Sequence, residues 1–279
     1  MNERLMLMIA SFLNNHPRAI DFAEAKAIAE DCGISIEESV ALMLAAFCGL
    51  NLDLSEDMVL YRQCFPSMLH KLSPALITGD PYVQALRTRV FRQGSVFLEE
   101  ERYAPAEIFV ADDFQSIRGL VLPQLGWFDE EVPYPALKEN GRIWMTVTPN
   151  EINTIRPCAE RSRGKVLCYG LGMGYYVFHA LMNPAVTSVT VVERSRDVIE
   201  LFRKALLPMF PRQDALEILE GDAFAYAAEK APNLAYDTVF TDLWHDVSDG
   251  LPMYRRMKAL ETKGPQYLYW IEPTMKYYL

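Results

Sequence analysis

The chain has 279 residues and a formal net charge of −10 at pH 7, a length that accommodates two domains of ordinary size. Its acidic balance disfavours contact with a nucleic-acid backbone, and no run of about 18 apolar residues predicts a membrane span. The amino-terminal stretch shows no small-residue cleavage site after its short amphipathic pattern, so we expect a cytoplasmic protein with neither nucleic acid nor a membrane as partner.

The cysteines give no indication of a metal site or of disulfides. They are five in number, they are scattered, and they form no Cys-x-x-Cys pair: Cys32, Cys48, Cys64, Cys158 and Cys168. This arrangement favours reduced thiols. We therefore expect no bound metal, and we expect small molecules or other proteins as partners.

Residues 1–104 are predicted to form a helical domain. Ser35 and Glu38 have the spacing of a capping box at the start of an apolar run, and Asp80 followed by Pro81 has the pattern of another helix start. These signals are typical of ordinary helix boundaries, and we expect a helical domain that supports the rest of the chain.

The stretch 25–47 has the outline of a helix-turn-helix. Its second helix carries Glu37 and Glu38 and no basic residue, so phosphate would repel it. A structural or oligomerisation role is therefore favoured over DNA binding, and a homodimer through these helices is one expectation.

The pattern changes near residue 105, where a domain spanning 105–279 is predicted to begin. Three short segments rich in aromatic and β-branched residues are separated by Gly, Pro, Asn and Asp: AEIFVADDF, GLVLPQLGWF and GRIWMTVT. They predict a short antiparallel β segment over about 105–147.

From about residue 160, strand patterns alternate with helix patterns. Five short apolar segments are predicted as strands: KVLCYG, VTSVTVVE, ALEILEGD, YDTVFTD and QYLYWIE. Because alternation of this kind builds parallel sheets with helices on both faces, we predict an α/β fold with a Rossmann-like, doubly wound sheet of about five strands.

Three glycines follow the first of these strands on alternate positions. Gly170, Gly172 and Gly174 lack the Cβ that would block a close approach, and ligands of such sheets bind beyond the carboxyl ends of the strands. The spacing is GxGxG, with Tyr175 where the last glycine of a dinucleotide fingerprint would fall, which weakens an NAD interpretation. The structural alternative is that the glycines only permit a turn from strand to helix.

Acidic residues follow the next three strands. Glu193 closes the second strand with a carboxylate that can accept hydrogen bonds from both ribose hydroxyls and would repel a 2′-phosphate. Asp222 follows the third strand, where it can meet an adenine amino group while the next backbone N–H meets a ring nitrogen, although Asp is also a preferred helix cap. Asp242 follows the fourth strand, and together the three predict an adenosine site.

The order of these signals resembles that of class I S-adenosylmethionine-dependent methyltransferases. The resemblance covers about residues 145–272, and VTVVERSRDVIELFRKALLP, ILEGDAFAY and YDTVFTDLW are similar to the spermidine-synthase-like branch. It implies S-adenosylmethionine as the cofactor and methyl transfer to a small-molecule acceptor. Aminopropyl transfer and a non-catalytic nucleotide-binding or assembly role are the alternatives.

The resemblance also implies a role for each matching residue. It places Gly170, Leu171, Gly172 and Gly174 beneath the methionyl and ribose parts of the cofactor, Glu193 and Arg194 at the ribose, Asp222 and Ala223 at the adenine, and Asp242 near the sulfonium or the acceptor. Asp242 and His245 are the predicted catalytic residues, each able to remove a proton from the acceptor, with Trp244 as an apolar or cation-binding wall. A loop histidine beside a packed tryptophan is the structural alternative.

Several positions depart from the family pattern. Cys168 stands where the family usually has an acid, and Met173 where spermidine synthases have Asp between the glycines. The segment LWHD replaces their acidic amine-binding loop, which disfavours aminopropyl transfer. The sequence given ends a few residues past the fifth strand, so we expect no final hairpin.

A further helix start precedes the glycine turn. Thr148, Pro149 and Glu151 form a capping box with Pro in the first turn. The pattern is fully explained as a helix start; the functional alternative is a lid in which Asn150 or Glu151 reaches into the cofactor site.

Overall fold

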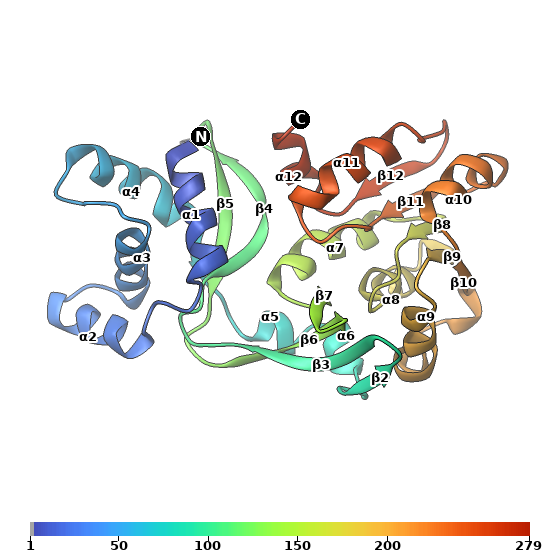
Figure 1. Cartoon of the computed structure of the whole chain (residues 1–279), viewed down its shortest axis with the longest axis horizontal. Coiled ribbons are helices and arrows are strands. Elements are labelled where there is room, and N and C mark those ends of the chain that lie inside the picture. The colour runs from blue at the N-terminus through green and yellow to red at the C-terminus, as the bar shows by residue number, and fades with distance from the viewer. Residues whose placement is uncertain (1–2) are drawn as a thin grey trace. The chain divides into compact units, whose positions relative to one another are not determined.

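The computed structural model describes residues 3–279. The chain divides into two compact units, the first comprising Met1–Thr78 and Arg102–Tyr134, the second Gly79–Glu101 and Pro135–Leu279 (Figure 1). This division differs from the single boundary expected at residue 104, because two of the strands predicted for the second domain group with the amino-terminal helices.

The first unit contains helices and a small mixed sheet. Strand β1 pairs in parallel with β5, and β5 pairs antiparallel with β4. The predicted cap is confirmed, since the Ser35 hydroxyl accepts a hydrogen bond from the Glu38 N–H at 3.1 Å. The elements are α1 (Glu3–Asn15), α2 (Phe22–Cys32), α3 (Ile36–Phe47), α4 (Ser55–Met68), β1 (Leu69–Lys71), α5 (Ala75–Thr78), β4 (Phe109–Ile117) and β5 (Leu120–Trp127).

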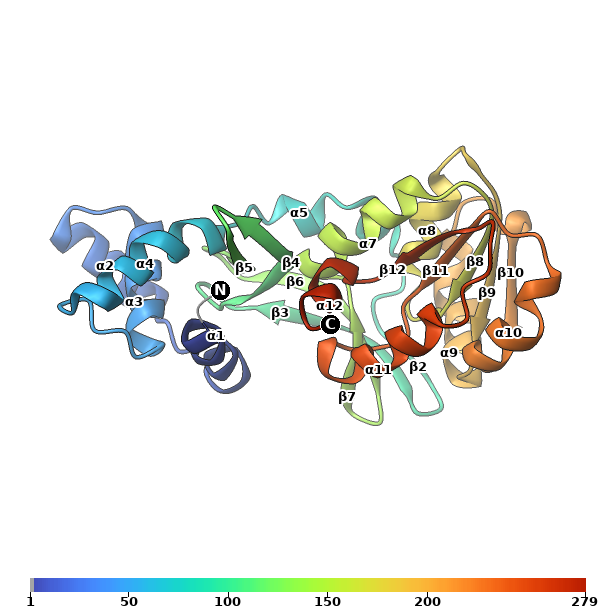
Figure 2. The ribbon, with the colours of Figure 1, turned by 90° about the horizontal axis from the view of Figure 1, so that it is seen from above.

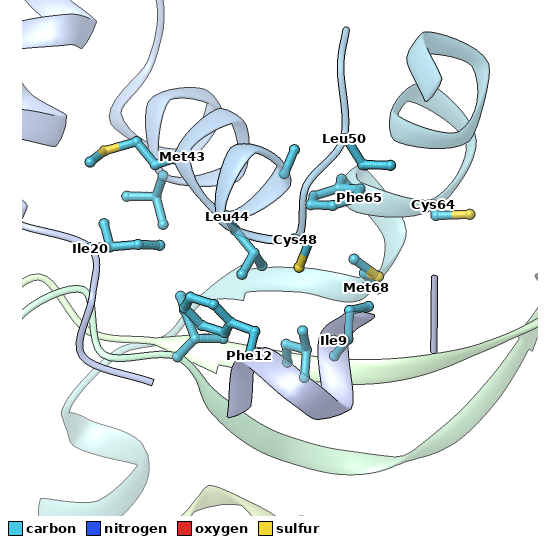
Figure 3. Close-up of a cluster of buried hydrophobic side chains, with 14 of the residues drawn as sticks. Ile9, Phe12, Ile20, Met43, Leu44, Cys48, Leu50, Cys64, Phe65 and Met68 are labelled. Atoms are coloured by element: carbon cyan, nitrogen blue, oxygen red, sulfur yellow. The ribbon is translucent and has the colours of Figure 1, made fainter. Parts of the chain in front are cut away.

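An apolar cluster of buried side chains holds the first unit together. Figure 3 shows side chains from α1, α3 and α4 meeting there, among them Phe12, Leu44, Phe65 and Met68. Trp127 at the end of β5 belongs to the same cluster, so the sheet is anchored to the helices by burial of apolar surface.

The second unit begins with a short helix and a four-stranded sheet. Asp80 caps the helix through its side chain, as predicted, with Pro81 in the first turn. The sheet has the order β2-β3-β6-β7 with antiparallel β2-β3 and β6-β7 pairs. The elements are α6 (Pro81–Ala85), β2 (Phe91–Gln93), β3 (Val96–Tyr103), β6 (Val132–Glu139) and β7 (Arg142–Thr146).

The expectation of helices up to residue 104 is wrong over β2 and β3. Gly94 and Ser95 form a two-residue turn between the paired residues Gln93 and Val96, and Gly94 has the positive φ of 55° that such hairpin turns require. The Asp197 carboxylate accepts hydrogen bonds from the Ser95 backbone and hydroxyl, so a distant helix fixes this turn.

The five strands predicted for the parallel sheet are confirmed. Their order is β10-β9-β8-β11-β12, and every pair is parallel. From β8 the chain adds β9 and β10 on one side, and it then returns to add β11 and β12 on the other side of β8. Right-handed crossovers in the two directions lie on opposite faces of the sheet. Figures 1 and 2 show α8 and α11 on opposite sides of the strands. The sheet is thus doubly wound, as the sequence predicts.

The elements of this part of the chain follow the βα alternation. They are α7 (Pro149–Arg161), β8 (Gly164–Tyr169), α8 (Tyr175–Met182), β9 (Val186–Glu193), α9 (Arg196–Leu201), a π-helical turn (Phe202–Leu206), β10 (Leu216–Glu220), α10 (Ala223–Glu229), β11 (Thr238–Thr241), α11 (Val247–Lys258), β12 (Gln266–Tyr269) and α12 (Glu272–Tyr277). Short 3₁₀ turns lie at Leu207–Met209, Gln213–Ala215 and Ala231–Asn233. Between residues 3 and 279, none of the helices is both long and apolar enough to cross a membrane.

Candidate functional site

A cavity of about 690 Å³ lies at the carboxyl ends of strands β8 to β11. Most of the predicted cofactor residues line it: Gly170, Gly172, Glu193, Arg194, Asp222, Ala223 and Asp242. They belong to four segments that are separated in the sequence and that the parallel sheet brings to one edge. The fold therefore gathers these residues around a single space.

The first two glycines of the turn have both a packing role and a place at the cavity. A Cβ on Gly170, whose φ is 92°, would lie 2.1 Å from the Asp242 carbonyl oxygen, so only glycine lets the turn pass the end of β11. A Cβ on Gly172 would meet the Met145 Sδ at 2.0 Å, and this thioether accepts a hydrogen bond from the Met173 N–H. Close packing against backbone explains Gly170 without a ligand, whereas the obstacle at Gly172 is the end of a flexible side chain. Both glycines also line the cavity.

Two other predicted residues of the turn face the interior. A Cβ on Gly174 would lie within 2.8 Å of the rings of Phe202 and Phe210, and the Leu171 side chain is buried. Neither is among the residues that line the cavity. Leu171 contributes instead through its backbone N–H, which donates to the Glu193 carboxylate.

Glu193 closes β9 with its carboxylate held by backbone groups. Its Oε2 accepts from the Leu171 N–H at 2.9 Å, and its Oε1 accepts from the Ser195 N–H at 2.7 Å. Each carboxylate oxygen can accept more than one hydrogen bond, so both retain capacity toward the cavity. The arrangement fixes an oriented acceptor pair beside the glycine turn.

Asp222 has the capping role that the sequence allowed. Its Oδ1 accepts from the Ala225 N–H at 2.8 Å at the start of α10. Asp222 and Ala223 also line the cavity, and a carboxylate that caps with one oxygen keeps the other available. Arg194 lies on the same rim, with its guanidinium carbon 6.0 Å from the centre of the Trp144 ring.

A second cavity of about 550 Å³ adjoins the first. Trp144, Met145, Asp242 and Trp244 line both cavities, which places the Asp242 carboxyl at their junction. The second cavity is also lined by Ile143, Thr146, Glu151, His245 and Trp270. Three tryptophans thus form its walls, of which the sequence singled out only Trp244.

Two carboxyl groups in this second cavity are partly buried. Burial raises the pKa of Asp242 to about 8, with a further contribution from the charge of Glu151. Burial also raises the pKa of Glu151 above its usual range, although its carboxylate accepts hydrogen bonds from the Thr146 hydroxyl at 2.7 Å and from Thr148. A carboxyl with a pKa near 8 is suited to exchange a proton at neutral pH.

The helix start at Thr148 has the capping role that the sequence predicts, whereas a lid over the cofactor site stays a prediction. The predicted capping box is present, with Pro149 in the first turn of α7. Glu151 reaches into the second cavity, whereas Asn150 is not among the residues that line either cavity. The same carboxylate therefore caps the helix and faces a space beside Asp242.

His245 is paired with an acid that sequence reasoning did not single out. Its Nδ1 lies 3.1 Å from the Asp249 Oδ2, and its backbone N–H donates to the same carboxylate. The ring stands edge-on to Trp144, with 4.0 Å between the ring centres. When Nδ1 donates to Asp249, Nε2 carries the lone pair, and this is the tautomer of a general base. The sequence feature that could have identified Asp249 is its capping-box spacing from Asp246.

Trp244 lines both cavities, and Cys168 lies buried behind the glycine turn. The Trp244 side chain is 5% exposed, and its Nε1 is buried without a hydrogen-bond partner among residues 3–279. An unpaired buried donor costs about 1–3 kcal/mol, which a ligand oxygen would relieve. The Cys168 thiol donates to the Gly170 carbonyl at 3.1 Å, and burial, with smaller contributions from Asp242 and Glu193, raises its pKa well above its usual range. Cys168 is therefore a neutral support of the glycine turn.

The glycine turn is held from behind by a buried tyrosine. The Tyr82 hydroxyl donates to the Met173 carbonyl at 2.7 Å, and the Tyr175 hydroxyl donates to Asp80 at 2.8 Å. Tyr175 and Tyr176 are both buried, as expected of aromatic residues that begin a helix packed on a sheet. These contacts tie α6 to the turn.

Replacing Tyr82 with phenylalanine is expected to lower the free energy of unfolding by about 1–3 kcal/mol, because the buried Met173 carbonyl loses its donor. Urea denaturation followed by circular dichroism measures this change. Tyr61→Phe is the matched control, since Tyr61 is half-buried and its hydroxyl has no hydrogen-bond partner in the described part of the chain. Equal effects of the two substitutions would contradict a supporting role for Tyr82.

Comparison with known proteins gives a limited likeness. No family model matches the sequence, and no curated protein matches it. Among solved structures, the spermidine synthase from Thermotoga maritima is 16% identical with a TM-score of 0.37, covering 64% of this chain and 55% of that one. The glycopeptide N-methyltransferase MtfA is 26% identical with a TM-score of 0.31, covering 41% of this chain and 54% of that one.

These two structures are of the kinds that the sequence resembles. This chain spans little more than half the length of each of them. With TM-scores this low, the likeness supports no statement about activity, and the function must be inferred from the two cavities.

Proposed function

We propose that the chain is an S-adenosylmethionine-dependent methyltransferase that acts on a small molecule. The observation that carries this proposal is the convergence of Gly170, Glu193, Asp222 and Asp242 from four strand ends on one cavity. Packing and capping account for Gly170 and Asp222 one at a time, but they do not account for the convergence of a glycine turn and three acids on one cavity. The adjoining second cavity provides space for an acceptor.

The residues present fit the adenosine end of this ligand. Glu193 offers an oriented oxygen pair to the two ribose hydroxyls, since its backbone contacts leave acceptor capacity. Asp222 and the Ala223 backbone lie where the adenine edge would be recognised. At the other end, Asp242 faces the junction of the cavities, where a cation would stabilise its ionised form.

The protein's part in the reaction would be orientation, exclusion of water and proton removal. The sulfonium supplies a methyl group that is already activated. The apolar walls of the second cavity hold the acceptor in line and keep water away. Asp242 and the His245–Asp249 pair would accept the proton of an acceptor that must lose one.

The first test is calorimetric titration with S-adenosylhomocysteine. We expect micromolar binding that weakens at least tenfold in Glu193→Ala, a loss of about 1.4 kcal/mol. Glu220→Ala is the matched control, because Glu220 is the exposed residue paired with Glu193 in the register of β10 and β9 and does not line the cavity. Absence of binding, or an equal loss in both variants, would overturn the adenosine site.

Aminopropyl transfer is a second candidate, favoured by one observation. The carboxyls of Glu151 and Asp242 both face the second cavity, and an acidic cavity suits an amine substrate. Titration with decarboxylated S-adenosylmethionine separates the candidates: tighter binding of the decarboxylated ligand than of S-adenosylmethionine would favour this second reaction. Binding of either ligand without turnover over a broad acceptor panel would indicate a non-catalytic module.

A further inference from the structure

The second cavity combines apolar walls with acidic groups. Trp144, Trp244 and Trp270 contribute indole rings, and Ile143 and Met145 add aliphatic surface. The Trp270 ring is fixed, because its Nε1 donates to the Thr154 hydroxyl at 2.8 Å. Rigid indole faces bind flat or compact apolar bodies, and they also attract cations.

The second cavity contains two acidic side chains, Glu151 and Asp242. The charge of Glu151 contributes to the raised pKa of Asp242, as expected of like charges that line one cavity. Lys and Arg are missing from the described residues that line the cavity. Within residues 3–279 neither carboxyl forms an ion pair, and His245 is the lining residue of this cavity that can carry a positive charge.

A partly buried carboxyl pair that forms no ion pair gains from a bound cation. Burying an unpaired charge is costly, and an ammonium within hydrogen-bond reach of both groups would offset that cost. The Trp244 Nε1 is a buried donor without a partner in the described chain, and an acceptor atom on a ligand would satisfy it, whereas the ammonium itself would not. Because acids and no Lys or Arg line this cavity in the described chain, a ligand bound there should carry a positive charge.

We propose, on the basis of the methyltransferase function proposed above, that the acceptor is a monoamine with an aromatic or compact apolar body. Its nitrogen lies at Glu151 and Asp242, and its body lies against the three indoles. The nitrogen is the atom that receives the methyl group.

The residues that line the cavity favour a monoamine over an alcohol, a carboxylate or a diamine. An alcohol of the same shape leaves the carboxyl pair without a counter-charge, and a carboxylate is repelled by it. A diamine lacks the aromatic or compact apolar body that would cover the indoles and Ile143. A monoamine satisfies the acidic end and the apolar walls together.

The proton and the electron pairs of the methyl transfer can each be assigned to a group. The bound ammonium first gives a proton to a carboxylate or to the His245 imidazole, which leaves a neutral amine with a free lone pair. That lone pair forms the new carbon–nitrogen bond while the carbon–sulfur bond breaks and its electron pair stays on sulfur. The products are an N-methylated ammonium, a neutral thioether and a protonated side chain.

A matched set of ligands tests this assignment on the full chain. Calorimetry at pH 7.5 would compare 2-phenylethylamine, 2-phenylethanol, 3-phenylpropanoate and 1,4-diaminobutane, each with and without saturating S-adenosylhomocysteine. We expect 2-phenylethylamine to bind at least tenfold more tightly than the other three. Equal binding of the alcohol, or tighter binding of the diamine, would overturn the proposal.

Substitutions at two positions of α7 test whether Glu151 causes the preference for the amine. Glu151→Gln is expected to weaken binding of 2-phenylethylamine at least tenfold and to leave 2-phenylethanol unchanged, and glutamine can preserve the capping box. Glu160→Gln is the control, since Glu160 is exposed on the same helix. Equal losses for amine and alcohol in Glu151→Gln would indicate a structural effect and overturn the assignment.

The two proposals fail in different ways. If the protein binds amines selectively but does not bind S-adenosylhomocysteine, the cofactor proposal is contradicted and the second cavity is supported as an amine site. If it binds the cofactor without selectivity for amines, only the assignment of the acceptor is contradicted. Appearance of N-methylated 2-phenylethylamine by mass spectrometry, with S-adenosylmethionine present, would support both.

Discussion

Replacing Gly170 with alanine is expected to lower the free energy of unfolding by about 3 kcal/mol or more and to abolish binding of S-adenosylhomocysteine. Gly170 has a φ of 92°, and an added Cβ would lie 2.1 Å from the Asp242 carbonyl oxygen. The obstacle is backbone at the end of β11, so a side-chain rotation cannot relieve it. Losses of this size are confined to a few mechanisms, of which backbone strain with overpacking is one.

The control for this substitution separates strain from collision. Gly141 has a φ of 80°, and a Cβ there would meet nothing within 4 Å, so Gly141→Ala should cost only the strain of the left-handed conformation, about 1–2 kcal/mol. Urea denaturation of both variants measures the difference. Equal costs would mean that the turn and the end of β11 are farther apart than the structure has them.

Replacing Asp242 with asparagine is expected to remove a pH dependence of stability. The folded protein holds a proton on Asp242 up to a pKa of about 8, whereas the unfolded chain releases it near the ordinary aspartate pKa of 3.8. Between these values the native state binds more protons than the unfolded state, so the free energy of unfolding of the wild type falls as the pH rises, by at most about 1.4 kcal/mol per pH unit from this group. Below the lower value the contribution is constant.

Asparagine carries no charge at any of these pH values, so Asp242→Asn should gain stability over the wild type progressively from pH 5 to pH 8. Urea denaturation at each pH unit measures the difference. Asp214→Asn is the control, because Asp214 is exposed on a surface turn and its variant should follow the wild type. A constant difference between Asp242→Asn and the wild type across this range would contradict the raised pKa.

The same carboxyl connects stability with the proposed activity. A buried group that destabilises the native state at neutral pH is typical of functional sites, where the protein retains a strained or desolvated group because its chemistry is needed. A bound cation at the junction of the cavities would stabilise the ionised form of Asp242. Stability gained in Asp242→Asn together with lost turnover would fit this interpretation.

Some features of the site could be read from local sequence alone. The five parallel strands follow from short apolar runs that alternate with helix patterns, and the rule that ligands bind at their carboxyl ends is enough to gather Gly170, Glu193, Asp222 and Asp242 at one edge. Helix caps such as Ser35 and Asp80 depend on residues a few positions apart. These signals are local, so the sequence carries them directly.

Other features depend on which distant segments meet. The β2-β3 hairpin lacks a strong strand pattern and is stabilised by Asp197 from α9. Gly174 shares the pattern of Gly170, yet it packs on Phe202 and Phe210 instead of the cavity. Spacing within a turn does not reveal which side of the backbone each glycine presents, because that depends on the neighbouring elements.

The sequence by itself determined the class of sheet, the position of the glycine turn and the acids at the strand ends. Only the tertiary structure decided that Trp144 of β7, Glu151 of α7 and Trp270 after β12 share a cavity with Asp242. These residues lie in separate elements and form no motif, so no periodicity or spacing connects them. Their proximity, and the desolvation that raises the pKa of Asp242, arise only when the chain packs.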